Sequence, residues 1–161
     1  MTMDAATISG GCQCGAVRYR AQPRPETSHI CHCRMCQKAV GGPFAALVNV
    51  DRNALEWTRG TPAEFASSAE VARGFCRECG TPLTYSYHAS KHLCITTASL
   101  DDPAQVPPQM QFGVEARLAW FTGLPQLPEE GTTEVTMPGA APAIAASNRQ
   151  HPDYDTESWP E

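Results

Sequence analysis

Residues 31–36 read Cys-His-Cys-Arg-Met-Cys and place three cysteines within six positions. Two cysteine pairs flank this triplet, Cys12 with Cys14 upstream and Cys76 with Cys79 downstream. Seven of the chain's 8 cysteines therefore fall into groups of two, three and two. Because a tetrahedral zinc site takes four ligands, seven thiols divide into one closed four-thiolate site and one three-thiolate site with an open position. We therefore expect two zinc ions per chain, and we expect any chemistry at the open position.

A disulfide framework is the rival interpretation, since 8 is an even number of cysteines. Two features disfavour it. A Cys-x-Cys pair closes a very tight ring, and the first residues, Met-Thr-Met-Asp-Ala-Ala, lack the basic start and apolar core of an export signal. The sequence therefore favours a cytoplasmic protein, in which thiols stay reduced, and it favours metal ligands over disulfides.

The composition of the 161-residue chain favours a mainly β fold. Hydrophobic residues make up 42%, which is typical of a globular protein, and 14 prolines with 12 glycines favour short strands joined by turns. Apolar and polar residues alternate over 16–20, 83–87 and 92–97, which predicts strands. Strands are also expected over 44–50 and 55–58, and one helical turn over 37–40. Residues 131–147 are expected to form a linker, and residues 151–155 form a motif-like stretch without an assigned mechanism. No run of about 18 apolar residues occurs, so no membrane span is expected.

The net charge of -5 is unevenly placed along the chain. Residues 128–161 contain seven acids and one base, so this segment carries -6 and the remainder about +1. Nucleic-acid-binding domains are usually strongly basic, so no nucleic-acid partner is expected. These patterns divide the chain into a lead-in (1–8), a zinc domain (9–128) and an acidic C-terminal tail rich in Pro, Gly and Ala (129–161).

The two cysteine pairs are expected to form the closed site. Each pair is followed by a glycine, Gly15 or Gly80, which gives the backbone the freedom to turn just past the second sulfur. Two such turns would hold one zinc at roughly 2.3 Å from each sulfur. The expected structural ligands are Cys12, Cys14, Cys76 and Cys79. This site would tie the first strand to the middle of the chain.

The triplet is expected to hold the second zinc. Its ligands would be Cys31, Cys33 and Cys36, with water or a substrate thiolate in the fourth position. Because a coordinated thiol is deprotonated, such a site would present a positioned sulfur nucleophile at neutral pH.

Two alternatives would give the triplet a role other than an open zinc site. His29, His32 or Cys94 could supply a fourth ligand and close the site, or two of the three cysteines could form a redox pair. The strand-like context of Cys94 favours a buried core role. His32 lies between two expected ligands and is expected to point to solvent.

Several cations are close in sequence to the cysteine turns. They could meet the carboxylates of an anionic substrate, and a solvated surface role is equally compatible with each. These residues are Arg18, Arg20, Arg34, Lys38, Arg73 and Arg77.

Residues 10–19, residues 31–36 with 41–44, and residues 74–81 resemble the glutathione-dependent formaldehyde-activating enzyme family, also called the centromere-protein-V/GFA group. Residues 99–103 and 124–125 are similar to its later signatures, and the resemblance covers about residues 9–128. It implies an Mss4-like fold of short antiparallel strands tied by a structural zinc. It also implies that the two cysteine pairs are the structural ligands, and that Cys31, Cys33 and Cys36 hold a catalytic zinc.

The resemblance further implies a carbon–sulfur lyase. The family's assigned activity joins glutathione to formaldehyde and gives S-hydroxymethylglutathione. We therefore expect a zinc-dependent enzyme that forms or cleaves an adduct between an aldehyde and a thiol, with glutathione as the expected small-molecule partner. The alternative is a zinc-stabilised binding module without catalytic activity, whose acidic tail contacts a partner. The residues leave the true substrate and the oligomeric state open.

Overall fold

The computed structural model describes residues 6–159 of the chain. Outside this range lie residues 1–5 and 160–161. The first group includes most of the N-terminal stretch used to judge the export signal, and the second belongs to the expected tail. The strands are β1 (Ile8–Gly11), β2 (Arg18–Pro23), β3 (His29–Cys31), β4 (Ala45–Arg59), β5 (Ala63–Ala66), β6 (Val71–Phe75), β7 (Pro82–Tyr87), β8 (His92–Thr96) and β9 (Met110–Phe112). The helices are α1 (Arg34–Val40), α2 (Thr133–Thr136) and α3 (Ala141–Ser147), with short 3-10 turns at Pro25–Thr27, Thr97–Ser99, Pro103–Gln105, Val114–Ala116 and Phe121–Gln126.

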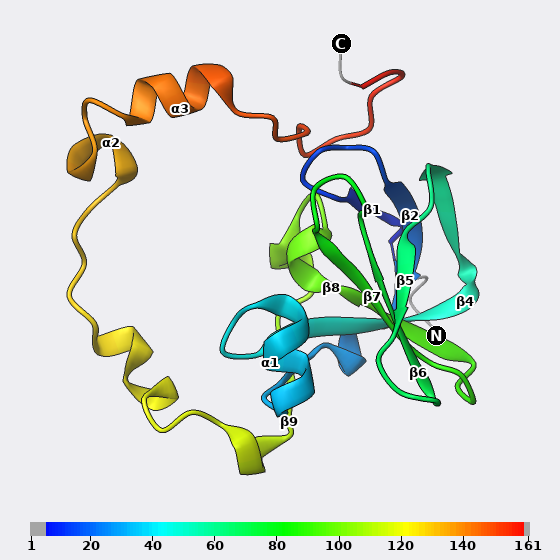
Figure 1. The fold of residues 1–161 in the computed structure, drawn as a ribbon. Helices are drawn as coiled ribbons and strands as arrows, with labels where there is room; N and C mark the ends of the chain where they lie inside the picture. Colours follow the sequence, from blue (N-terminus) through cyan, green and yellow to red (C-terminus); the bar gives the residue numbers. More distant parts are fainter. Residues whose placement is uncertain (1–5, 160–161) are drawn as a thin grey trace.

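All of the strands belong to one sheet, which confirms the expected mainly β fold of antiparallel strands (Figure 1). The order along the sheet is β1-β2-β4-β8-β7-β6-β5, and each neighbouring pair is antiparallel. Strand β3 lies off this path. It pairs antiparallel with β4 on one side and parallel with β9 on the other, so β9 shields its outer edge.

Strand β4 is the longest strand of the sheet and pairs with β2, β3 and β8. The sequence predicts two strands, over 44–50 and 55–58, but the structure has one strand from Ala45 to Arg59. Its first part pairs with β3 and β8, and its second part pairs with β2. The residues between the two expected strands, 51–54, contain no Gly or Pro, and the strand continues through them. Arg52 ties the strand to the β7–β8 turn, since its guanidinium donates to the carbonyl oxygens of Ser90 and Tyr87.

The core consists of two groups of buried side chains. The larger group lies around Tyr19, Val48, Leu83 and Ile95, all of which are fully buried. The smaller group contains Cys36, Ala45, Leu47 and Cys94, and Cys31 and Cys33 pack against it. The cysteine triplet is therefore part of a packed interior, and the expected core position of Cys94 agrees with the structure.

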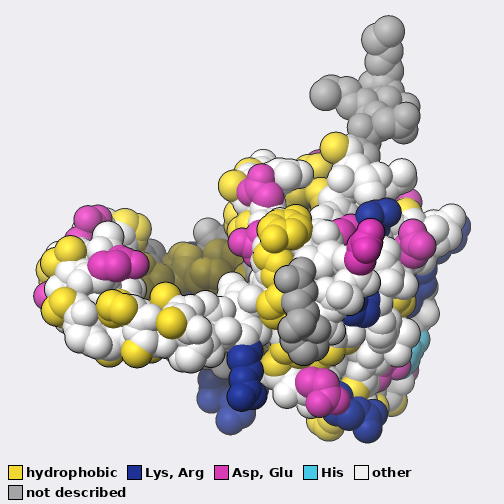
Figure 2. All heavy atoms as spheres, turned by 90° about the horizontal axis from the view of Figure 1, so that it is seen from above, with side chains coloured by type: hydrophobic (Ala, Val, Ile, Leu, Met, Phe, Trp, Pro, Cys, Tyr) yellow, Lys and Arg dark blue, Asp and Glu magenta, His cyan; other side chains and the backbone are white. Residues whose placement is uncertain are grey.

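The last third of the chain leaves the body of the protein and returns to it. From about residue 117 the chain runs as a wide arc that carries α2 and α3, and its end packs beside β1 and β2 (Figure 1). In a space-filling view the arc projects from the body with acidic and apolar side chains on its surface (Figure 2). Composition predicted a linker over 131–147 but gave no sign that the residues after it would dock. Within residues 6–159, no helix has the length and apolar character needed to cross a membrane.

Two cysteine clusters as candidate metal centres

The sulfurs of Cys12, Cys14, Cys76 and Cys79 all lie within 4.8 Å of one another. The Cys12–Cys14 and Cys14–Cys76 sulfur distances are 3.6 and 3.8 Å. A tetrahedron with metal–sulfur bonds of about 2.3 Å has edges of about 3.8 Å, so the spacing fits one zinc ion. All eight cysteines of the chain are free thiols in the structure. The donor set and its geometry therefore fit a four-thiolate metal site.

Two similar turns bring these sulfurs together. One turn joins β1 to β2 and the other joins β6 to β7, so strands that are distant along the sheet order meet at this cluster. Each turn ends in a glycine with positive φ, +75° at Gly15 and +77° at Gly80. The Gln13 backbone N–H donates to Thr81 Oγ1 at 3.0 Å and joins the two turns directly. The glycine pattern seen in the sequence is thus a real geometric requirement of both turns.

The protonation behaviour of this cluster also suits a metal. Burial raises the pKa of Cys12 to about 12, although a backbone N–H from Val17 acts in the opposite direction. At Cys79 burial acts to raise the pKa, but hydrogen bonds from Thr81 outweigh it and lower the value to about 6. A cation at the centre would stabilise four thiolates that otherwise repel one another in a poorly solvated site.

The end of the chain covers this four-cysteine cluster. The His151 backbone N–H donates to the carbonyl oxygen of Gln13 at 2.7 Å. The residue is 4% exposed, and its ring packs edge-on against Trp159 with 5.0 Å between the ring centres. A Cβ placed on Gly15 would lie 2.3 Å from the His151 ring. Cysteine spacing gave no indication of this contact; the only signal was a motif-like stretch at residues 151–155 without an obvious mechanism.

Charge pairing also anchors the same segment. Asp155 accepts hydrogen bonds from both Arg18 and Arg20, at 2.7 Å to a terminal guanidinium nitrogen in each case. Arg18 is 4% exposed and forms a second, two-pronged pair with Asp101, in which both bonds are 2.7 Å. Two of the cations near the cysteine turns are therefore structural, because they join the first hairpin to the chain end.

The second cluster contains Cys31, Cys33 and Cys36, whose sulfurs also lie within 4.8 Å of one another. Each comes from a different local position: Cys31 ends β3, Cys33 is the N-cap of α1, and Cys36 is buried in the first turn of that helix. The Cys36 backbone N–H donates to Sγ of Cys33 at 3.4 Å. The helix start thus bends the chain so that three sulfurs face one point.

The residues expected as alternative fourth ligands are engaged elsewhere. His29 Nδ1 hydrogen-bonds to the Thr27 carbonyl oxygen at 2.8 Å, and Cys94 donates to Asn49 Oδ1 at 3.0 Å. Within the described part of the chain, the group of mutually close His, Cys, Asp and Glu ligand atoms ends at the three cysteines. Three sulfurs leave one corner of a tetrahedron open for an added ligand.

The expectation that His32 points to solvent is wrong. Its side chain is fully buried, its ring packs edge-on against Phe121 and Phe44, and Nε2 lies 2.9 Å from Gln111 Oε1. Successive side chains of an extended chain point to opposite sides, so the side chain of His32 points away from the sulfurs of its neighbours Cys31 and Cys33. On that side lie the rings of Phe44 and of Phe121, the second of which belongs to the C-terminal arc.

Arg73 connects β6 to the triplet. Its Nη2 donates to Sγ of Cys36 at 3.5 Å, Nε donates to Ser67 Oγ at 3.1 Å, and the guanidinium carbon lies 5.0 Å from the centre of the Tyr85 ring. Burial raises the pKa of Cys36, and the Arg73 hydrogen bond opposes that rise. Sequence reasoning included Arg73 only as one of several nearby cations. The pairing of β5, β6 and β7 gives it this position.

The pKa values of the cysteines in the triplet shift in different directions. Burial raises the pKa of Cys31 to about 12. At Cys33 burial acts in the same direction, but the Cys36 backbone N–H and other hydrogen bonds outweigh it and lower the pKa. The N-cap sulfur is thus the one that the start of α1 stabilises as a thiolate.

Comparison with known proteins gives a consistent picture. The family model described as "Glutathione-dependent formaldehyde-activating enzyme" matches residues 7–116. A Schizosaccharomyces pombe protein named as an uncharacterized lyase is 29% identical over 83 residues, which are 52% of this chain and 60% of that protein. A Halomonas elongata protein named "Putative glutathione-dependent formaldehyde-activating enzyme" is 33% identical over 85 residues, 47% of this chain and 54% of that one. The chain thus spans little more than half the length of these curated relatives.

A solved structure supports the fold. The crystal structure of a Rhodobacter sphaeroides protein superposes with a TM-score of 0.54 at 20% sequence identity. The match covers 65% of this chain and 99% of that protein. This likeness concerns the fold alone. Because the match covers nearly all of that protein and about two thirds of this chain, this chain has further residues beyond the shared fold.

Proposed function

The chain belongs to the glutathione-dependent formaldehyde-activating enzyme family, and on that premise we propose that it is a zinc-dependent carbon–sulfur lyase. Its substrate would be an adduct between a thiol and an aldehyde, with S-hydroxymethylglutathione as the leading candidate. The name of the yeast relative, a lyase, and that of the Halomonas elongata relative support this class of reaction. Both names come from proteins that the chain covers only in part.

One observation carries the proposal: three cysteine sulfurs converge within 4.8 Å, and no further ligand atom from the described residues joins them. The four-cysteine cluster has the full complement of ligands and suits a structural role. The triplet suits a role in which a substrate completes the set. A zinc ion bound there would supply a Lewis-acidic position at which a thiol is held as a thiolate.

The chain's own residues would hold and orient the reactants. Cys31, Cys33 and Cys36 would fix the open corner on one side of a packed core. Four thiolates around one divalent ion carry two net negative charges, and Arg73, in contact with Cys36, offsets part of this charge. His32 and its aromatic neighbours Phe44 and Phe121 pack on the opposite face of the loop.

The proposed reaction balances without an oxidant or a further reactant. In the adduct-forming direction the thiol sulfur attacks the aldehyde carbon, a carbon–sulfur bond forms, and the carbonyl π bond breaks. The proton that leaves the thiol ends on the aldehyde oxygen. The lyase direction reverses each change. Because the thiol and the aldehyde also combine without a catalyst, positioning of the two reactants would be the main contribution of the site.

The test is the rate at which glutathione, formaldehyde and their adduct exchange at equilibrium, followed by NMR. The zinc-loaded protein is expected to accelerate this exchange in proportion to its concentration. The Cys33→Ser variant is expected to lose the acceleration and keep its fold, because the four-cysteine site remains. The control is Cys94→Ser, which changes a cysteine outside both clusters. No acceleration by zinc-loaded wild-type protein would reject the enzyme in favour of the binding module.

Two further proposals follow from this function. A thiol-based mechanism needs reduced cysteines, which a cytoplasmic location provides. We also propose that residues 9–128 form the catalytic unit and that the tail from residue 129 serves its stability, since its end packs on the structural cluster.

A further inference from the structure

We propose that two copies of this chain pair through their C-terminal arcs, so that the acidic and apolar arc of each copy lies in a cationic and apolar groove of the other. The arc residues concerned are 127–148, and the groove lies between α1 and the strands β5 and β6. These arc residues follow the part of the chain that the family model matches. The inference concerns an interaction surface and is independent of the proposed reaction.

The arc makes few contacts with the body of its own copy. Residues 127–148 are exposed, apart from Ala140 and Ala141. Among residues 6–159, each of their hydrogen bonds joins residues at most four positions apart, so none reaches the body. An ordered segment must offset its lost conformational entropy with buried surface. The exposed side chains include four large apolar ones that a partner surface can bury: Leu127, Val135, Met137 and Ile144.

The arc is also acidic. Glu129, Glu130 and Glu134 are exposed, and the chain has no Lys, Arg or His from residue 118 to residue 148. Among the described residues, none of these three carboxylates forms an ion pair. A surface that complements the arc must therefore combine cations with exposed apolar side chains.

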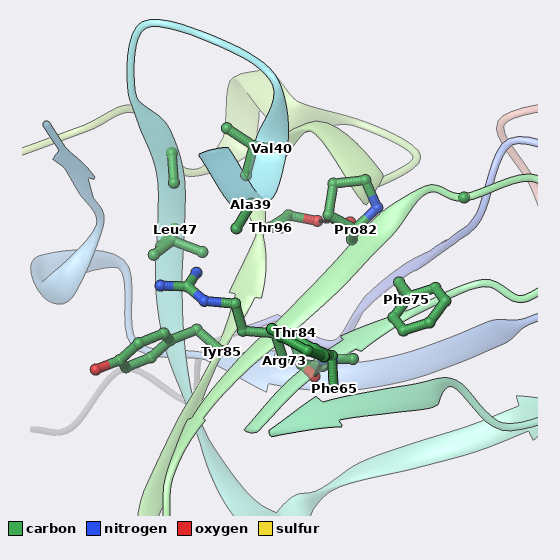
Figure 3. A pocket seen from close by; sticks show the side chains of 13 residues that line it. Ala39, Val40, Leu47, Phe65, Arg73, Phe75, Pro82, Thr84, Tyr85 and Thr96 are labelled. Atoms are coloured by element: carbon green, nitrogen blue, oxygen red, sulfur yellow. Dashed lines mark hydrogen bonds between the residues drawn. The ribbon is translucent and has the colours of Figure 1, made fainter. Parts of the chain in front are cut away.

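Two adjoining hollows form the groove. They lie between α1 and the strands β5 and β6, and their volumes are about 160 and 470 Å³. Ala39, Phe65 and Arg73 line both hollows, which makes them continuous. Figure 3 shows the Arg73 side chain reaching across the smaller hollow toward Leu47 and the Tyr85 ring.

The groove carries the charge opposite to that of the arc. Its cations are Arg34, Lys38 and Arg73. Within residues 6–159, no acid lines either hollow and none of the three cations forms an ion pair with an acidic side chain. Two exposed apolar side chains lie beside them, Met35 at 50% and Phe65 at 64% exposure. The groove thus combines cations and apolar surface, as the arc requires.

The arc does not cover the groove of its own copy. Of the described residues that line the two hollows, none belongs to the arc. The arc is fixed on its own body at both ends: the Phe121 ring packs against His32, and the His151 backbone N–H donates to Gln13. Between these points the chain projects away from the body (Figure 1 and Figure 2). A second copy can therefore supply the arc that fills each groove.

Two-fold symmetry satisfies both surfaces at once. Since the arc and the groove belong to one chain, a two-fold axis pairs the arc of each copy with the groove of the other, and the contact forms twice per dimer. A stable interface involves roughly 20–30 residues a side. Residues 127–148 and the lining of the groove together reach this size.

The first test is zero-length carbodiimide cross-linking of the zinc-loaded protein, in an equal mixture of unlabelled and nitrogen-15-labelled chains. The reagent joins a carboxylate to a lysine amine, and the chain has two lysines, both exposed: Lys38 in the groove and Lys91 next to β8. We expect products in which Lys38 of one isotope is joined to an arc glutamate of the other, and none between Lys91 and the arc.

Three outcomes of the cross-linking would overturn the inference. Products of a single isotope only would assign the groove to the arc of the same copy. The absence of any product between Lys38 and the arc would leave the groove to another partner. Equal coupling of the arc to both lysines would show that it meets the body without selecting the groove.

The second test reverses charges and measures mass by sedimentation at about 0.1 M salt, where the Debye length is about 10 Å. The groove variant is Arg34→Glu/Lys38→Glu, and the arc variant is Glu129→Lys/Glu130→Lys/Glu134→Lys. A combined variant carries both sets of changes. The matched controls reverse the same numbers of exposed charges elsewhere: Arg77→Glu/Arg149→Glu and Glu56→Lys/Asp153→Lys/Glu157→Lys.

We expect a dimer for wild type and both controls, and a dissociation constant roughly a hundredfold higher for the groove variant and for the arc variant, because like charges then meet in the groove. The combined variant should return to within about tenfold of wild type, since its arc and groove again carry opposite charges. That recovery also shows that the reversed surfaces still fold. A wild type that is monomeric at every concentration, a dimer that neither reversal weakens, an equal loss in the controls, or no recovery in the combined variant would each overturn the inference.

Discussion

Nη2 of Arg73 lies 3.5 Å from Sγ of Cys36 and donates a hydrogen bond to it, which joins a strand of the sheet to the cysteine triplet. In the four-cysteine cluster the Val17 backbone N–H and the Thr81 hydroxyl hydrogen-bond to sulfurs, and among residues 6–159 no arginine does so. The two clusters thus differ in their surroundings as well as in their number of sulfurs. A cation beside three thiolates suits a site that gains a fourth, negatively charged ligand.

Arg73→Met should weaken zinc binding at the triplet roughly tenfold or more, because it removes a hydrogen bond to a ligand sulfur and a compensating charge. Zinc at the four-cysteine site should be unaffected. Competition with a chromophoric chelator resolves the two ions by affinity. Arg149→Gln is the control for loss of an exposed charge, and an equal change in that variant would refute a specific role for Arg73.

The two clusters should respond differently to loss of one sulfur. Cys14→Ser should lower the melting temperature strongly, because the four-thiolate site joins two distant hairpins and metal binding there is coupled to folding. Cys33→Ser should lose one zinc per chain with a much smaller change in melting temperature. Calorimetry and metal analysis on the same samples check both. The reverse order of the two melting temperatures would contradict the assigned roles.

Gly113→Ala should disturb the triplet from outside it. Gly113 has φ of +62°, and a Cβ there would lie 2.5 Å from the backbone nitrogen of Cys33. We expect a loss of at least about 1–2 kcal/mol of unfolding free energy from the backbone conformation alone, together with weaker zinc binding at the triplet. Gly139→Ala is the control, since its site is open. Chemical denaturation measures the loss, and an unchanged midpoint would count against the close approach.

The chain end should contribute to stability through Asp155. Asp155→Asn leaves the buried Arg18 with Asp101 as its one carboxylate partner, and should cost about 1–2 kcal/mol, a value reduced for the partial exposure of Asp155. Among residues 6–159 the exposed Asp153 has no ion-pair partner, so Asp153→Asn removes the same charge and should change little. Urea denaturation compares them. Equal midpoints for the two variants would show that the segment does not anchor the fold.

The same ion pairs predict an acid dependence. At Asp155 burial acts to raise the pKa, but hydrogen bonds from Arg18 and Arg20 outweigh it and hold the pKa below its ordinary value; Asp101 behaves likewise beside Arg18 and Ser9. Their contribution to stability is therefore present above the ordinary carboxyl pKa and declines as the pH falls toward the lower folded values. The difference in unfolding free energy between wild type and Asp155→Asn should thus shrink on acidification below about pH 4. A difference that grows would contradict this sign.

The local chemistry of the clusters could be predicted from the sequence because it depends on short spacings. The glycines after each cysteine pair, the helical turn after Cys36 and the core position of Cys94 all follow from neighbouring residues. The long strand β4 could not be predicted, because its continuity through residues 51–54 depends on pairing with distant strands. The burial of His32 depends on Phe121, almost ninety positions away.

The most informative misses concern contacts between distant segments. The motif-like stretch at residues 151–155 gives no indication of what it contacts, so the docking of His151 and Asp155 on the first hairpin could not be predicted. Arg73 was one cation among several until the strand register placed it beside Cys36. Cysteine spacing thus indicated the donor sets, whereas the tertiary fold decides which charges surround each of them.

The most direct test of the open triplet is zinc K-edge X-ray absorption on freshly purified, reduced protein, with zinc per chain measured on the same sample and glutathione then added. We expect two zinc ions per chain, with roughly 3.5 sulfurs per zinc on average, rising toward about 4 when glutathione binds. One zinc per chain, or a sulfur number that glutathione does not change, would contradict an open metal site that accepts a thiol.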